Sequence, residues 1–514
     1  SEREEVPGVI SDYFDGADYK AFKANNLFQS PEDIAIALYA DGFVNQNKGK
    51  QELVILHVMV LNYDPALRYT DQYLFQLAVI PGKPQNLDSF LTPFVDEVES
   101  LGKYGLIVKK INGEVIKAKV HMVMATGDIP QAKKITKGTI FAKLPTMVGS
   151  STFGLDEMHP IEQGMGRLVH KFIVLSNMIS SGSTDKKDNS NNFRYSKKKN
   201  DYATDYTFKL DRKDLLDAGK CIENSRSKIP VSFQGSWDNL VKKTDGARAI
   251  DFIDFLLYAL PTVFVPFFNS ANTRKALLHL SRGCAIALQW ELTEELIVEM
   301  GNCFSVWHNF LQNEVNHERL SVKIFTANNH YLTHIGFMIR RAGGLRVYSA
   351  RSMERTIGRY SKLIKSRVRS GKNAGKVVER LSITGFLNHA LAVKDILDVI
   401  QSNKTSLDDY MELSSSSVSN INNHQLWSPF SVVESELQKQ LLEQKTFEKE
   451  LQKYYTRCIS STAQPVQIKN IVDIVIAGRS LIFSQVYSSE MYRIKRGERS
   501  RGNHYVMFEV NVKR

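Results

Sequence analysis

The order of apolar runs between residues 34 and 128 is the feature that most constrains the fold of this 514-residue chain. Three strand-like runs, one run with helical spacing and a fourth strand-like run follow one another: "IAIALYADGF", "ELVILHVMVLNY", "YLFQLAVIPG", "NLDSFLTPFVDEVESLG" and "KAKVHMVMATGD". The sequence therefore predicts a β-β-β-α-β unit. Asp41 closes its first strand and Asp128 closes its fourth.

The ribonuclease H-like fold requires such a unit with an acid on its first and fourth strands. These two strands are neighbours in that fold, so the two carboxylates converge on one metal site. We therefore expect an α/β protein with a ribonuclease H-like catalytic core and a mixed sheet. A large, mainly helical insertion interrupts the core, and a small β-containing region ends the chain. The expected parts are a lead-in at 1–30, the first part of the core at 31–150, the insertion at 151–345, a basic helix completing the core at 346–400, a linker at 401–430 and a C-terminal helix and β region at 431–514.

A third acid is expected from a helix beyond the insertion, and Glu354 in "RVYSARSMERTIGRYSKLIKSRVR" is the candidate. Three carboxylates can bind two divalent cations, Mg²⁺ or Mn²⁺, for phosphoryl transfer. Simpler roles are open for each acid. Asp41 could begin an Asp-Gly turn, Asp128 could be a helix N-cap followed by proline, and Glu354 could pair with Arg351 at i, i+3.

The helix around Glu354 holds the densest run of cations in a chain whose net charge is +12. Met353, Ile357, Tyr360 and Ile364 give it one apolar face. The cations on the remaining surface are expected to contact DNA phosphates, or else to form a merely solvated face: Arg351, Arg355, Arg359, Lys362, Lys365, Arg367 and Arg369, with Lys372 and Lys376 beyond them.

The cysteine pattern and the apolar runs predict an intracellular protein. The four cysteines are scattered without a CxxC pair, which favours a reducing compartment. The most apolar run, "IDFIDFLLYALPTVFVPFF", contains two aspartates and two prolines, so we expect a buried helix and no membrane span. The run "KKKN" at 197–200 fits nuclear import.

Several motifs, in this order, resemble the transposases of CACTA-type (En/Spm-like) DNA transposons, particularly those of fungal genomes. The resemblance covers about residues 10–400 and rests on these stretches: "DYFDGADY", "LFQSPEDIAIALYADGF", "LAVIPGKPQNLDSFLTPFVDEV", "VMATGDIPQAKK", "LDEMHPIEQGMGRLVHKFI", "HYLTHI" and "YSARSMERTIGRYSKLI". It implies a DDE transposase in which Asp41, Asp128 and Glu354 are the catalytic acids. The implied reaction is metal-dependent cleavage of double-stranded DNA at transposon ends, followed by attack of the freed 3′-hydroxyl on target DNA; a homodimer is a further expectation.

The same resemblance, extended to the more distant V(D)J recombinase core, implies a structural zinc. A C/D-x2-H motif is matched by Asp156 and His159 in "DEMH". His330 and His334 stand at i, i+4, a spacing that lets two imidazoles on one helix face bind one ion. These four residues are therefore predicted to converge on Zn²⁺, the alternative being ordinary hydrogen-bonded histidines.

The sequence also departs from the family pattern. The segment "KITKGTIFAKLPTM" lacks the cysteine usual soon after the second acid, and the upstream zinc-finger-like region is expected to be absent. A catalytically inactive or domesticated transposase-derived DNA-binding protein is therefore the main alternative. A ribonuclease H-like nuclease acting on RNA–DNA hybrids is a third.

Overall fold

The computed structural model gives the positions of most residues up to 390 and of short segments beyond. It describes residues 6–45, 51–70, 73–82, 84, 86–109, 112–127, 140–147, 149–178, 193–198, 201–202, 204–229, 233, 235–242, 247–364, 370–390, 410–412, 425–427, 479–482 and 485–488. The chain divides into two compact units, 1–222 with 237–393 and 223–236 with 394–514, which are described separately.

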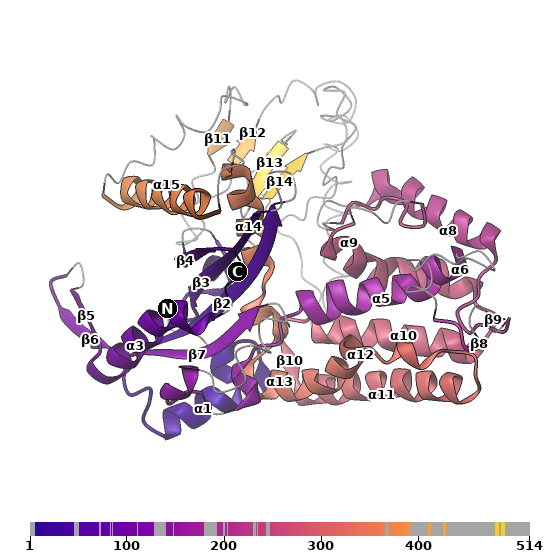
Figure 1. Ribbon diagram of the computed structural model, residues 1–514, viewed down its shortest axis with the longest axis horizontal. Helices are drawn as coiled ribbons and strands as arrows, with labels where there is room; N and C mark the ends of the chain where they lie inside the picture. The colour runs from indigo at the N-terminus through magenta and orange to yellow at the C-terminus, as the bar shows by residue number, and fades with distance from the viewer. Residues whose placement is uncertain are drawn as a thin grey trace, which may run out of the picture. The chain divides into compact units, whose positions relative to one another are not determined.

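A mixed four-stranded sheet is the centre of the N-terminal part of the first unit (Figure 1). Its strands are β2 (Ile34–Asn45), β3 (Gln51–Val60), β4 (Leu74–Pro81) and β7 (Val120–Gly127). Their order is β4-β3-β2-β7, in which β2 pairs antiparallel with β3 and parallel with β7. The predicted neighbourhood of the first and fourth strands is confirmed.

Apolar side chains of β2 alternate between the two faces of the sheet, as the pleat of a strand buried on both sides requires. Ile36, Leu38 and Ala40 pack with α3 (Asp88–Tyr104) on one face. Ala35, Ala37 and Tyr39 belong to the larger core on the other face. That second face is contacted by α14 (Arg351–Leu363) and α15 (Ser370–Ala390), so helices cover both faces.

A largely helical region lies between β7 and α14 in the sequence. Its longer segments are η6 (Met158–Gly166), α5 (Arg167–His170), η7 (Lys171–Leu175), α8 (Arg212–Ser225), α9 (Ala249–Asp254), η9 (Phe255–Phe264), α10 (Ala271–Ala287), α11 (Glu294–Asn316), α12 (Ala327–Tyr331) and α13 (Ile335–Ala342). Short segments complete it: α6 (Ser176–Met178), β8 (Ser196–Lys198), β9 (Asp201–Tyr202) and β10 (Leu292–Thr293).

The helical region has an aromatic centre. Trp307 of α11 is fully buried and stacks on Phe172 with a centroid separation of 6.4 Å. Its indole Nε1 donates to Asn329 Oδ1 at 2.9 Å, which satisfies the polar group that such burial would otherwise leave unpaired. The predicted apolar helix is present too: Ala249–Phe267 is long and apolar enough to cross a membrane, and 56% of its most apolar window is buried within the protein, as in a core helix.

The N-terminal lead-in is tied to both parts of this unit. β1 (Val9–Ile10) pairs with β10, and α1 (Ala17–Ala24) packs on α13. Asp12 forms a buried ion pair of 2.7 Å with Arg68 of α2 (Pro65–Arg68). Burial of this paired carboxylate and guanidinium explains Asp12, the first residue of "DYFDGADY", structurally.

Three details differ from the sequence-based expectations. β2 does not end at Asp41 but continues to Asn45, paired with β3, so the Asp-Gly turn interpretation is wrong. A hairpin of β5 (Leu106–Lys109) and β6 (Val115–Ala118), which was not predicted, lies between α3 and β7. Phe90, one of the apolar residues that give "NLDSFLTPFVDEVESLG" its helical spacing, is 46% exposed and lies outside the buried face of α3.

The second unit contains a small antiparallel sheet in the order β11-β12-β13-β14. Its strands are β11 (Tyr410–Glu412), β12 (Gln425–Trp427), β13 (Arg479–Ile482) and β14 (Gln485–Ser488). Two of these strands come from the predicted linker, 401–430. Most of the C-terminal helix and β region predicted at 431–514, including its helix, lies outside the described residues.

Candidate functional site

Asp41 lies at the point where the parallel β2–β7 ladder stops. The last register pair between these strands is Ala40 with Gly127, whereas the pairing of β2 with β3 continues past Asp41, which lies opposite Ile55. The Asp41 side chain is 7% exposed, and its Oδ1 accepts from the Gly42 N–H at 2.7 Å. By the alternation of β2, Asp41 is on the face of Ala37 and Tyr39, which is the face that α14 contacts.

Asp128 lies outside the described residues, but the residue before it is described. Gly127 approaches β2 so closely that a Cβ there would lie 2.0 Å from Ala40 O, and its φ of +152° is one that other residues rarely adopt. The two strands are therefore still paired, in close contact, one residue before each predicted aspartate.

Helix α14 is fixed on the sheet by polar as well as apolar contacts. His57 of β3 is buried, with Nδ1 2.9 Å from Met353 Sδ and Nε2 donating to Gln76 Oε1 at 2.7 Å. The Tyr360 hydroxyl donates to the same Gln76 oxygen. Met353, Tyr360 and Ile364 are at most 3% exposed, and Ile357 packs at the edge of the core, so the predicted apolar face of this helix is confirmed.

Glu354 is in the first turn of α14, next to Met353, and is partly buried. Its backbone N–H donates to Ala350 O at 3.1 Å. Asp41 and Glu354 thus belong to elements that contact each other, on the same side of the sheet. The structure describes two of the three predicted acids and brings their elements together.

The predicted DNA-contacting cations have different surroundings. Arg351 is partly buried and pairs with carboxylates inside the protein, which does not fit its predicted contact with phosphate. Arg355 is exposed and donates to Tyr69 O at 3.1 Å, and Arg359 lies over the Tyr360 ring at 5.6 Å. Lys362 is exposed. The remaining members lie outside the described residues: Lys365, Arg367 and Arg369.

The four predicted zinc ligands form two pairs. Asp156 accepts from His159 Nδ1 at 2.7 Å, and its other carboxylate oxygen accepts the N–H of Met158, the first residue of η6, at 2.7 Å. His330 and His334 are exposed, with their Nε2 atoms 3.0 Å apart.

One member of each pair lies on elements that are in contact, His159 on η6 and His330 on α12. Yet no three histidine, cysteine, aspartate or glutamate side chains among the described residues are grouped to hold a metal ion. The four residues therefore form two separate pairs and not one group, and the shared zinc site stays a prediction.

A buried network of charged residues that was not identified from the sequence connects η6 with the start of α14. Glu157 and Glu162 are each 1% exposed, and Arg351 pairs with both; its Nε lies 3.2 Å from Glu157 Oε1. Burial, with Asp156 and Glu162 adding negative charge, raises the pKa of Glu157 to about 8. Burial also raises the pKa of Glu162, against the opposing effect of Arg351.

The sequence contained a signal for this network. "DEMHPIEQ" has three carboxylates within seven residues next to a run of apolar residues. Its first and fourth residues are the predicted metal ligands, and local patterns predict no role for the two glutamates. Their partner stands almost 200 residues away, beyond the reach of local patterns.

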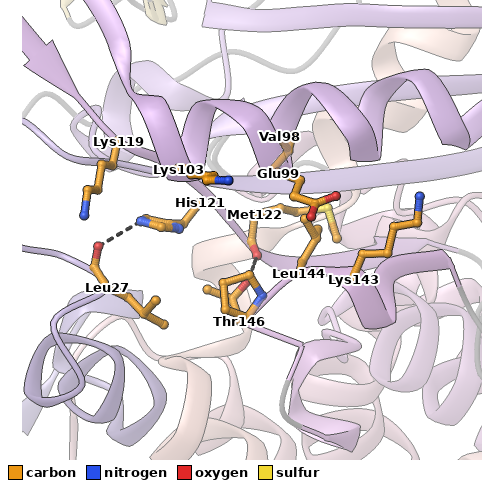
Figure 2. A pocket seen from close by; sticks show the side chains of 12 residues that line it. Leu27, Val98, Glu99, Lys103, Lys119, His121, Met122, Lys143, Leu144 and Thr146 are labelled. Carbon is orange, nitrogen blue, oxygen red and sulfur yellow. Dashed lines mark hydrogen bonds between the residues drawn. The ribbon is translucent and has the colours of Figure 1, made fainter.

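A pocket of about 240 Å³ lies at the other end of the β2–β7 pair, near Val120 (Figure 2). Lys103, Lys119 and Lys143 line it together with one carboxylate, Glu99. His121 donates from Nε2 to Leu27 O at 2.8 Å, and burial lowers its pKa. None of the candidate residues that the structure describes lines this pocket, so it is separate from the Asp41 end of the sheet.

Neither the protein-family models nor the curated proteins with which the chain was compared match it. The function of the chain is therefore inferred from its residues and from their arrangement in the structure.

Proposed function

We propose that this chain is a DDE-type DNA transposase, a polynucleotidyl transferase built on a ribonuclease H-like core and acting in the nucleus. One observation carries the proposal. Parallel neighbouring strands β2 and β7 pair up to Ala40 and Gly127, and an aspartate follows each of these residues in the sequence. The helix that carries Glu354 packs on the same face of this sheet as Asp41.

The donor set suits Mg²⁺ or Mn²⁺. Asp41 and Glu354 offer carboxylate oxygens, which hard divalent cations prefer, and Asp128 is the third proposed ligand. Two such cations would activate the attacking oxygen and stabilise the leaving oxygen. The residues of this chain would hold these ions at the edge of the sheet and orient the DNA strand beside them.

The proposed reaction has two balanced steps. In the first step, a water oxygen bonds to the phosphorus atom of a phosphodiester at the transposon end as the bond from phosphorus to the 3′-oxygen breaks, which leaves a 3′-hydroxyl and a 5′-phosphate. In the second step, the oxygen of that 3′-hydroxyl bonds to a phosphorus atom of the target DNA as the bond from phosphorus to the target strand's 3′-oxygen breaks. The attacking hydroxyl releases its proton to solvent, and the departing 3′-oxygen takes up a proton from solvent.

Nicking of a supercoiled plasmid in Mn²⁺ or Mg²⁺ tests the proposal. Loss of outer-shell partners of a metal already costs about 10–100-fold, so Asp41→Asn, Asp128→Asn and Glu354→Gln should each slow nicking by more than about 100-fold. Glu379→Gln, which alters an exposed glutamate on α15, is the matched control and should nick at the wild-type rate.

Three outcomes separate the alternatives. Undiminished nicking by the Asp41 or Asp128 variant would refute the assignment of the acids. Tight DNA binding without nicking by the wild-type protein would favour the inactive, transposase-derived DNA-binding protein. Cleavage selective for RNA–DNA hybrids would favour a ribonuclease H-like nuclease.

The salt dependence of DNA binding tests the basic helix separately. Each phosphate contact contributes about 0.9 to the slope of log K against log salt, so Lys362→Ala should reduce the slope by about one. Lys323→Ala, a change at an exposed lysine of the helical region, should leave the slope unaltered. Equal slopes for all three proteins would mean that α14 does not contact phosphate through Lys362.

A further inference from the structure

The buried carboxylates of η6 are placed where they can control the position of α14. Arg351 is the first residue of α14, and its guanidinium pairs with Glu157 through Nε and with Glu162 through Nη2. A guanidinium is suited to this arrangement because its planar fork presents several donors at once. Both carboxylates come from one segment, so the pairs join that segment directly to the start of the helix.

Ser349 strengthens the same connection. Its hydroxyl donates to Glu157 Oε1, and its Oγ accepts the backbone N–H of Arg351 at 3.2 Å. Ser349 therefore caps the start of α14 and binds one of the two carboxylates that hold Arg351. We call Glu157, Glu162, Ser349 and Arg351 the α14 clamp.

The α14 clamp is close to the proposed third acid. Glu354 follows Arg351 at i, i+3, which is less than one turn of an α-helix. Between them, Ser352 and Met353 are buried, so the intervening backbone has little freedom to move alone. A displacement of the first turn would move Glu354 with it.

Stability alone does not explain why charges are used here. Replacing a buried ion pair by well-packed apolar residues is often neutral or stabilising, so apolar residues could join η6 to α14 equally well. A guanidinium that contacts two carboxylates through different nitrogen atoms adds a defined direction to the connection, which matters where a carboxylate must be held at a fixed position.

We propose that Arg351 is a positioning residue, which acts through the α14 clamp to hold the first turn of α14, and with it Glu354, in place over the sheet. Its effect on catalysis rests on the proposed function, whereas its effect on α14 does not. The two parts can therefore be tested by different measurements on the same full-length proteins.

Hydrogen exchange of the full-length protein tests the placement of α14. In Arg351→Met, amides of 351–363 should exchange at least about 10-fold faster than in the wild type, because local opening of this helix becomes easier. Amides of β3 and of α10 should stay within twofold of wild type. Arg351→Lys, which keeps the charge but loses the fork, should restore part of the protection, and Glu162→Gln gives a milder variant if Arg351→Met does not fold.

Arg282→Met is the matched control, since Arg282 forms an exposed ion pair with Glu299 between α10 and α11. It should leave exchange of α14 unchanged. Exchange of 351–363 within twofold of wild type in Arg351→Met, or an equal acceleration in every segment, would overturn the inference.

Plasmid nicking tests the catalytic part. For Arg351→Met the rate at saturating DNA should fall by roughly 100-fold while the Kd for DNA stays within about threefold, as expected when only a transition-state group is displaced. A loss of DNA affinity equal to the loss of rate would show that Arg351 contacts phosphate and would overturn the positioning role. A wild-type protein that does not nick refutes the proposed function, and the exchange data then still decide the clamp.

Discussion

The four-stranded sheet and the α14 clamp stabilise the protein by different means. Both faces of β2 pack through alternating apolar side chains, where other apolar side chains of similar volume are tolerated best. At the clamp, two glutamates and one arginine are buried and depend on each other's charge. The sheet should therefore be most sensitive to changes of shape, and the clamp to changes of charge and pH.

The largest effect of shape is expected at Gly127. In Gly127→Ala the new Cβ would lie 2.0 Å from Ala40 O, at a φ of +152°. Steric overlap and backbone strain together should lower the free energy of unfolding by about 3–5 kcal/mol. Urea unfolding followed by circular dichroism measures the change.

Gly301→Ala is the control from the helical region. Gly301 lies within α11 with open space around the position of a Cβ, so alanine should raise the free energy of unfolding by about 0.5–1 kcal/mol. Equal effects of the two substitutions would contradict the close approach of β7 to β2.

The contrast also explains which parts of the structure could be predicted. The succession of strands and helix along the chain followed from local apolar runs, because a period of two and short turns are visible within ten residues of sequence. The neighbourhood of the first and fourth strands followed from the expected ribonuclease H-like fold. The apolar face of α14 followed from Met353, Tyr360 and Ile364 for the same reason. The β5–β6 hairpin was missed because its side chains are largely exposed, and Ile107, at 73% exposure, has no core partner to suggest it.

The surroundings of the candidate site were harder to predict. A cation such as Arg351 looks the same in sequence whether it faces DNA or a buried carboxylate 189 residues away. Asp156 with His159 and His330 with His334 both have metal-binding spacing. The spacing within one pair does not determine whether the other pair is close enough to complete a site. The surroundings of Arg351 and of the predicted zinc ligands both depend on residues that are distant in the sequence.

The clamp should make stability depend on pH through Glu157. Its pKa is about 8 in the folded protein and near 4.5 in an unfolded chain, so between these values the folded state binds the extra proton. The contribution of the Glu157 proton to the free energy of unfolding is therefore complete below pH 4.5 and is lost as pH rises from 4.5 toward 8. Glu157→Gln should remove this slope, which amounts to at most about 2 kcal/mol between pH 6.5 and 8.

The lowered pKa of His170 decides in which pH range the effect of Glu157 on stability can be measured separately. Burial lowers the pKa of His170 to about 4, so this residue makes stability rise with pH between 4 and 6.5, opposite to Glu157. The difference between wild type and Glu157→Gln above pH 6.5 is free of that contribution. A slope that is the same in both proteins would show that Glu157 does not carry the proton.

The smallest effect is expected at the exposed histidine pair. His330 and His334 contact each other at the surface, so His330→Ala should change the free energy of unfolding by less than about 0.5 kcal/mol. His170→Ala is the buried counterpart, and loss of its bond to Leu240 O together with the cavity should cost about 2–4 kcal/mol. Thermal unfolding and metal analysis of the purified proteins measure both. One equivalent of zinc in the wild type that is lost in His330→Ala, together with a large loss of stability, would instead mean that the two pairs join around a metal.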